Sequence, residues 1–191
     1  MEKIGLTGVL GSGKTTAAKY FQSLGVPVFI ADNSAKYLMV KDLELRNQIV
    51  ELLGPESYSN DKLNKEYVSE KIFNSKKLLN SMNELVHPAV KKDFDGWMIK
   101  QNYSYIIYEA ALIFENGSES LFDKIICVST PIEIIHKRVS IRDNYSSELI
   151  NKIINSQLSQ DYKCLKSDYC IYNKTKPILY KQIDNIHKSL I

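Results

Sequence analysis

The sequence predicts an α/β protein in which helices cover both faces of a parallel sheet and one long helical insertion interrupts it. Two observations lead to this class. Short, apolar, β-prone runs alternate with helical patterns near the start of the chain and again after residue 103, and such alternation is typical of parallel sheets. Between residues 33 and 102 the strand pattern is absent, and apolar residues recur at helical spacing.

The first elements follow from apolar runs and turn residues. The run from Ile4 to Thr7 predicts a buried strand, and the glycine-rich stretch after it predicts a turn. We expect a helix from Lys14 to about Leu24, because Gly25 then supplies a stop signal. Residues 26–30 predict a second strand that carries a proline near its start, where a strand tolerates one.

The insertion over residues 33–102 is expected to hold several helices. Asn64 and Ser75 are suitable N-caps for two of them. Pro88 is expected in the first turn of a further helix, where its missing N–H is tolerated.

The rest of the chain returns to alternating elements. Thr130-Pro131-Ile132-Glu133 predicts a helix start, with Thr130 as N-cap and Glu133 completing a capping box. We expect strands at residues 105–108, 124–129 and 169–172, and helices at residues 131–142, 147–162 and from 176 onward.

Charge and composition exclude several classes of protein. The 25 basic and 22 acidic residues give a net charge of +3, and the basic ones are scattered, so the dense basic surface of a nucleic-acid binder is not expected. No apolar run approaches the roughly 18 residues of a membrane span. The start of the chain leads directly into a strand, so we expect no signal peptide and a cytoplasmic location. Cys127, Cys164 and Cys170 form no metal or disulfide pattern, and we expect reduced thiols.

Residues 8–15 read Gly-Val-Leu-Gly-Ser-Gly-Lys-Thr, which matches the phosphate-binding P-loop G-x-x-x-x-G-K-[ST] without a substitution. The predicted strand before it and helix after it are the setting that this motif requires. Its glycines let backbone amides approach a phosphate, and the helix start adds positive potential. Lys14 is expected to reach the β- and γ-phosphates, and the Thr15 hydroxyl to bind Mg²⁺. The predicted ATP-binding residues are Gly8, Gly11, Ser12, Gly13, Lys14, Thr15 and Thr16.

Two acidic residues follow predicted strands. Asp32 comes directly after the second strand, at the carboxyl edge where α/β proteins build their sites, and it could orient an acceptor hydroxyl or hold Mg²⁺. It could equally cap the next helix. Glu109 ends the strand at 105–108, as a Walker-B acid would.

Arg138 and Arg142 lie four residues apart and therefore on one helix face. This spacing suits a lid over a nucleotide that stabilises charge on a transferring phosphoryl group, and it also suits a solvated helix face.

In combination these segments resemble the dephospho-CoA kinase family. Residues 4–16 resemble its Gly-Leu-Thr-Gly-Gly-Ile-Gly-Ser-Gly-Lys-Ser-Thr, and residues 25–32 resemble its Gly-x-Pro-Val-x-Asp-Ala-Asp. Residues 109–115 resemble Asp-Val-Pro-Leu-Leu-Phe-Glu, and His87-Pro88 matches a His-Pro pair. Arg138, Arg142, Gln157 and Asn173 fall at matching positions in the C-terminal pattern, so the resemblance covers essentially the whole chain. Four residues depart from the pattern: Val9, Ile30, Glu109 and Ala111.

The resemblance implies ATP-dependent phosphorylation of the 3′-hydroxyl of dephospho-CoA, the last step of coenzyme A synthesis, with Mg²⁺ as cofactor. It implies that Lys14, Asp32, Arg138 and Arg142 are catalytic, that Asp32 is the base and a Mg²⁺ contact beside Thr15, and that His87 touches the acceptor. Residues 1–32 and 103–191 become a P-loop core with a lid at about 138–150, and residues 33–102 an acceptor-binding insertion. We expect a monomer whose partners are small molecules.

Two other functions remain to be weighed. Another P-loop kinase acting on a nucleoside, nucleotide or other small molecule would use the same insertion and lid. A GTPase-like switch would read guanine with Asn-Lys-x-Asp, but residues 173–176 read Asn-Lys-Thr-Lys and lack the required carboxylate.

Overall fold

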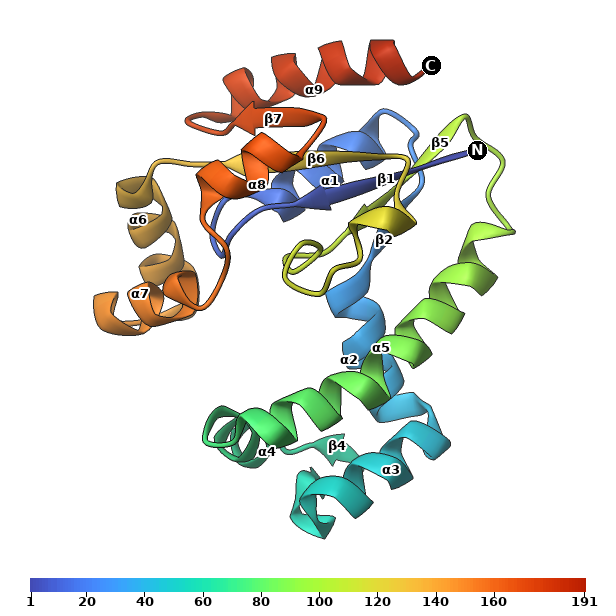
Figure 1. The fold of residues 1–191 in the computed structure, drawn as a ribbon, viewed down its shortest axis with the longest axis vertical. Helices are drawn as coiled ribbons and strands as arrows, with labels where there is room; N and C mark the ends of the chain where they lie inside the picture. The colour runs from blue at the N-terminus through green and yellow to red at the C-terminus, as the bar shows by residue number, and fades with distance from the viewer. The chain divides into compact units, whose positions relative to one another are not determined.

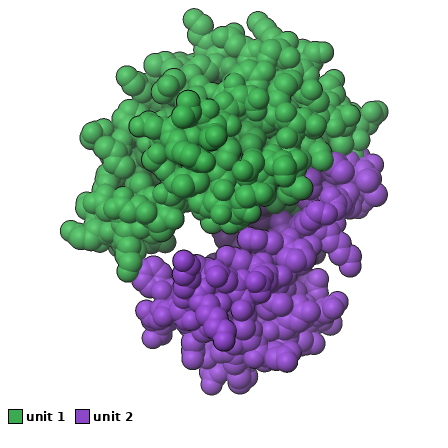
Figure 2. All heavy atoms as spheres, in the orientation of Figure 1, with its two compact units in different colours: residues 1–30, 101–191 green, residues 31–100 purple.

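The structure is a computed structural model that describes residues 1–191. Its chain forms two compact units, one of residues 1–30 with 101–191 and one of residues 31–100 (Figure 2). The elements of the first unit are β1 (Glu2–Thr7), α1 (Lys14–Ser23), β2 (Val28–Ile30), β5 (Tyr105–Glu109), η2 (Glu119–Leu121), β6 (Lys124–Ser129), α6 (Ile132–Asp143), α7 (Ser147–Asn155), α8 (Gln160–Lys166), β7 (Tyr169–Tyr172) and α9 (Lys176–Leu190) (Figure 1).

The first unit is built on a five-stranded sheet in the order β2-β5-β1-β6-β7, with every pair parallel. Helices α1 and α9 pack together on one face, and α8 packs against β6 and β7. Alternate side chains along the strands point to this face: Ile4 and Leu6 of β1 and Ile126 and Val128 of β6 are buried in the cluster that includes α1 and α9. This arrangement confirms the predicted α/β class with a parallel sheet covered by helices.

The second unit contains α2 (Ala31–Lys41), α3 (Leu43–Leu53), η1 (Pro55–Ser57), β3 (Tyr58–Ser59), β4 (Lys62–Leu63), α4 (Lys65–Phe73) and α5 (Lys76–Met98). The N-caps expected at Asn64 and Ser75 are confirmed, since their side chains accept from the amides of Tyr67 and Leu78. The short antiparallel hairpin β3–β4 was missed. Its turn at Asn60 and Asp61 has positive φ at both residues, which is the two-residue turn favoured by such side chains.

The expected helix start at Pro88 is wrong, because Pro88 lies inside the 23-residue helix α5. A proline inside a helix removes one hydrogen bond and costs about 3 kcal/mol. Helix α5 tolerates it because it packs against three other helices through a buried face that recurs every four residues, at Met82, Val86, Val90 and Phe94.

The expected helix over residues 147–162 is two helices, α7 and α8. Residues 156–159 leave the helical path, and Ser159 caps α8 by accepting from the Tyr162 amide at 3.2 Å. Gln157 and Leu158, in this break, bond to two other segments of the unit, as described below. The break therefore serves tertiary contacts that local spacing does not reveal.

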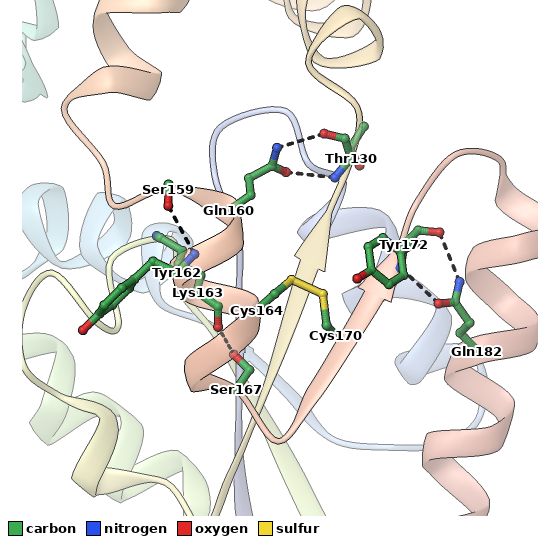
Figure 3. Close-up of a disulfide and its surroundings, with 10 residues drawn as sticks. All are labelled: Thr130, Ser159, Gln160, Tyr162, Lys163, Cys164, Ser167, Cys170, Tyr172 and Gln182. Carbon is green, nitrogen blue, oxygen red and sulfur yellow. Dashed lines mark hydrogen bonds between the residues drawn. A yellow bond between two sulfur atoms is a disulfide. The ribbon is translucent and has the colours of Figure 1, made fainter.

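The expectation of three reduced thiols is also wrong. Cys164 on α8 and Cys170 on β7 form a disulfide with their Cα atoms 5.1 Å apart (Figure 3). They are six positions apart in the sequence, and the chain reverses after α8 so that their side chains meet. Cys127 is free and buried.

Candidate active site

The P-loop connects β1 to α1 and ends with Gly13 as the N-cap of α1. Gly13 has φ 98° and ψ 20°, and no side chain caps the helix. The first amides of α1 therefore have no side-chain acceptor, so they can bind an anion. Lys14 begins the helix, and its Nζ donates to the Val9 carbonyl at 3.2 Å.

Two of the glycines are required by close packing as well as by backbone angles. A Cβ on Gly13 would overlap the amide nitrogen of the Asn173 side chain, and a Cβ on Gly8, at φ 147°, would overlap the Val128 carbonyl. Both positions lie in the region of φ that favours glycine. The main chain can therefore turn tightly here only because Gly8 and Gly13 have no Cβ.

The carbonyl of Ser12 is held from behind by two donors. Thr130 Oγ1 donates to it at 2.7 Å and Asn173 Nδ2 donates to it at 2.8 Å. Thr130 follows β6 and Asn173 follows β7, so the ends of two strands fix the phosphate-binding loop.

This arrangement corrects the expected capping box at Thr130. The N-cap of α6 is Pro131, and no side chain caps that helix. The Thr130 hydroxyl is instead within hydrogen-bond distance of the Ser12 and Asn173 carbonyls. A buried hydroxyl that binds the P-loop is not available to a helix end.

The P-loop fits a polyphosphate in three respects. The amides at the α1 start are uncapped, the main chain turns tightly at glycines that have no room for a Cβ, and the buried Ser12 Oγ has no hydrogen-bond partner. An unpaired buried hydroxyl is costly and is resolved when a ligand supplies the partner. Thr15 and Thr16 lie in the first turn of α1, and Thr15 is exposed, so its hydroxyl is accessible to a Mg²⁺ ion. The residues present therefore fit a nucleotide with its metal ion.

The two predicted arginines occupy different environments. Arg138 Nη1 lies 3.6 Å from the position of a Cβ on Gly13, and Nη2 donates to Asn173 Oδ1 at 3.5 Å. Burial lowers the pKa of Arg138 from its usual value. Arg142 forms a two-pronged ion pair with its neighbour Asp143, at 2.8 and 2.7 Å, and this hydrogen-bonded pair raises the pKa of Arg142 and lowers that of Asp143. The structure thus brings Arg138 beside the P-loop and pairs Arg142 with Asp143.

Helix α6 is anchored so that Arg138 keeps this position. Ile135 and Val139, on either side of Arg138 along the helix, are buried in a cluster with Val9 and with Ile150 of α7. Val9 stands in the P-loop itself. Its apolar side chain therefore ties the phosphate-binding loop to the helix that carries the guanidinium.

The predicted acidic residues follow adjacent strands. In the sheet register Glu109 pairs with Leu6 of β1 on one side and with Ile30 of β2 on the other, and it is buried. Helix α2 begins at Ala31, so Asp32 lies exposed in its first turn and is not its N-cap. The chain reaches Asp32 two residues after β2 ends, at the carboxyl edge of the sheet.

His87 belongs to the unit of residues 31–100. It lies on the exposed side of α5, and partial burial lowers the pKa of its imidazole from the usual value. At neutral pH this favours the neutral ring, which can accept or donate one hydrogen bond.

Comparison with known proteins decides the family. The model of the dephospho-CoA kinase family matches residues 3–177. The chain belongs to the dephospho-CoA kinase family. The curated dephospho-CoA kinase of Bacteroides fragilis YCH46 is 35% identical over 182 residues, covering 95% of this chain and 89% of that protein. That of Porphyromonas gingivalis W83 is 32% identical and covers 97% and 93%.

Solved structures show the same fold. A crystal structure of a Thermus thermophilus protein has a TM-score of 0.89 at 23% identity, covering 100% of this chain and 98% of that one. The dephospho-CoA kinase of Campylobacter jejuni has a TM-score of 0.64 at 23% identity, covering 99% and 97%. Shikimate kinase of Bacteroides thetaiotaomicron follows at 0.56 and 15%, with coverage of 99% and 98%. The family resemblance and the P-loop kinase fold predicted from the sequence are therefore confirmed.

Two glutamines support the P-loop from behind, and sequence reasoning missed one of them. Gln160 makes two hydrogen bonds to the backbone of Thr130: its Oε1 accepts from the amide at 2.8 Å and its Nε2 donates to the carbonyl at 3.0 Å (Figure 3). Gln157 Oε1 accepts from the Leu10 amide in the P-loop at 3.0 Å. The family pattern singled out Gln157, but no local signal marked Gln160.

Proposed function

We propose that this chain transfers the γ-phosphoryl group of ATP to the 3′-hydroxyl of dephospho-CoA, giving coenzyme A and ADP. One observation carries the proposal. A complete P-loop occurs in a chain that belongs to the dephospho-CoA kinase family. Two side chains hold its Ser12 carbonyl, and the amides at the start of α1 have no side-chain cap.

The P-loop and Arg138 account for binding and charge stabilisation. The amides at the start of α1 and the Lys14 ammonium hold the β- and γ-phosphates, and Arg138 beside Gly13 lies where it can stabilise charge that develops on the transferring group. When bound, Mg²⁺ would neutralise phosphate oxygens, with Thr15 and Asp32 as the residues that would hold it. Arg142 is proposed to join Arg138 after it exchanges its Asp143 partner for phosphate.

Asp32 is proposed as the general base. Strands β1 and β2 are separated only by β5, so their carboxyl ends lie about 10 Å apart. Asp32 comes only two residues after the end of β2 in the chain, which supports the proposal. It would accept the proton of the 3′-hydroxyl as the oxygen attacks the γ-phosphorus, which typically contributes about 10²- to 10⁴-fold in rate.

Residues 33–102 are proposed to bind the acceptor, with His87 among the contacts, and residues from about 138 to 150 to act as the lid of a core made of residues 1–32 and 103–191. No helix in the chain is long and apolar enough to cross a membrane. The monomeric state, the cytoplasmic location and the absence of nucleic-acid partners stay predictions.

Product analysis tests the proposal directly. Incubation with ATP, Mg²⁺ and dephospho-CoA should give coenzyme A and ADP in equal amounts. A panel of nucleoside monophosphates should give no product, and turnover of any of them without turnover of dephospho-CoA would overturn the assignment.

The base is tested by Asp32→Asn, which should lower kcat by about 10²-fold or more while leaving ATP affinity largely intact. Asp161→Asn is the matched control, because Asp161 is also an exposed aspartate in the first turn of a helix. Equal kcat in Asp32→Asn and the control would remove Asp32 from the mechanism.

A further inference from the structure

Lys163 is a fully buried lysine that none of the proposed catalytic steps uses. It lies on α8 with 0% of its side chain exposed. Its Nζ lies 2.7 and 3.0 Å from the two carboxylate oxygens of Glu115 and donates to the Ala111 carbonyl at 2.7 Å. Removing an ammonium group from water is costly, and a native protein retains one inside only with such compensation.

The first connection from Lys163 to the P-loop passes through Ala111. The Ala111 carbonyl also accepts from Thr7 Oγ1 at 3.1 Å, and Thr7 directly precedes Gly8 of the P-loop. Ala111 belongs to the loop that follows β5, next to β1 in the sheet. One carbonyl is thus shared by the buried lysine and the residue that enters the P-loop.

The second connection passes through Glu115. Its Oε1 accepts from the Leu158 amide at 2.9 Å, and Leu158 is adjacent to Gln157, whose side chain accepts from the Leu10 amide at 3.0 Å. The carboxylate therefore orients the break between α7 and α8. That break in turn binds the main chain of the P-loop.

We propose that the Lys163–Glu115 pair is a positioning element for nucleotide binding. The pair joins the loop after β5 to the break between α7 and α8. The first of these segments binds Thr7, directly before the P-loop, and the second binds the Leu10 amide inside the P-loop. Lys163 itself touches no phosphate. The inference rests on the proposed function only in taking a nucleotide as the P-loop ligand.

An apolar replacement of both partners provides the test. Replacing one partner leaves a buried charge uncompensated, whereas replacing both with apolar residues of similar size is often tolerated. Lys163→Met with Glu115→Leu should fold and should bind ADP–Mg²⁺ about tenfold more weakly in isothermal titration calorimetry. Thermal unfolding, followed by circular dichroism, verifies that the variant is folded at the assay temperature.

A matched control distinguishes positioning from general stability. Lys124 on β6 and Glu2 on β1 form a second ion pair within the same sheet, at 3.2 Å, and both lie at the amino ends of their strands, opposite to the P-loop. Lys124→Met with Glu2→Leu should leave ADP affinity within twofold. Wild-type affinity in the Lys163/Glu115 double variant, or an equal loss in the control, would overturn the inference.

A second double variant decides the question if the apolar one does not fold. Lys163→Gln with Glu115→Gln removes both buried charges while keeping a polar group at each position, and it should weaken ADP binding about threefold; unchanged affinity would then refute the positioning role. Because the readout is nucleotide binding, it is separate from the proposed acceptor. A wild-type chain that binds ADP but does not phosphorylate dephospho-CoA would contradict the proposed function and leave this test intact.

Discussion

Thr130 and Asn173 both donate to the Ser12 carbonyl, and we call this pair of donors the clamp. We predict that their contributions to stability are coupled. Thr130→Val removes one donor and keeps the shape of the side chain, and Asn173→Ala removes the other. Ser12, Thr130 and Asn173 are 0%, 1% and 2% exposed, so water cannot replace either donor. Each single variant still leaves the Ser12 carbonyl with one protein donor.

The magnitude follows from that geometry. Loss of one hydrogen bond costs about 1 kcal/mol of unfolding free energy in each single variant. In the double variant the carbonyl is buried without any donor, which adds the desolvation penalty of about 1 to 3 kcal/mol. The cavity left by Asn173→Ala is present in that single variant and in the double variant, so its cost cancels when the coupling energy is calculated. We therefore expect a coupling energy of about 2 kcal/mol between Thr130 and Asn173.

Urea unfolding of the four proteins measures this coupling, provided that the two units are observed separately. The only tryptophan, Trp97, lies in the unit of residues 31–100, so its fluorescence reports that unit. Far-UV circular dichroism reports the helices of both units, so a transition seen by circular dichroism but not by Trp97 fluorescence belongs to the unit that contains the P-loop. If the two single losses add to the double loss within about 0.5 kcal/mol, as independent sites do, the shared-acceptor argument is refuted.

Three further predictions concern the cysteines and Gly13. Burial raises the pKa of Cys127 to about 11, so at pH 8 only about one thiol in a thousand is ionised, and a thiol reagent should label the chain in urea but not in the native state. The Cys164–Cys170 bridge spans six residues of sequence, and reduction should lower the free energy of unfolding by about 2 kcal/mol, measured by urea titration with and without dithiothreitol. Gly13→Ala should abolish nucleotide binding, since its Cβ displaces the Asn173 amide; normal ADP affinity by calorimetry would contradict the packing described.

Much of the site could be predicted because its signals are local. The P-loop is a contiguous motif, and the strand before it and the helix after it could be identified from apolar spacing. Asn64 and Ser75 were identified as caps because a cap depends only on the residues that follow it. The alternation of strands and helices then implied the parallel sheet.

Two of the errors occurred where a local pattern competes with a distant partner in the fold. Thr130 matches a capping box in sequence, but the P-loop lies close enough in the fold to take its hydroxyl. The helix expected at 147–162 breaks because Gln157 and Leu158 bind Leu10 and Glu115, which are 147 and 43 residues away along the chain. No window of local sequence contains both members of such a pair.

We expect acceptor choice and nucleotide binding to depend on different parts of the chain. Every group that fixes the P-loop, from Thr7 to Asn173, belongs to the unit of residues 1–30 and 101–191. A shikimate kinase shares this fold at 15% identity, so the fold itself leaves the acceptor undetermined. Discrimination among acceptors must then come from residues outside the clamp. Substitutions in residues 33–102 should therefore change the KM for dephospho-CoA while ADP affinity stays constant, and variants of the clamp should do the reverse.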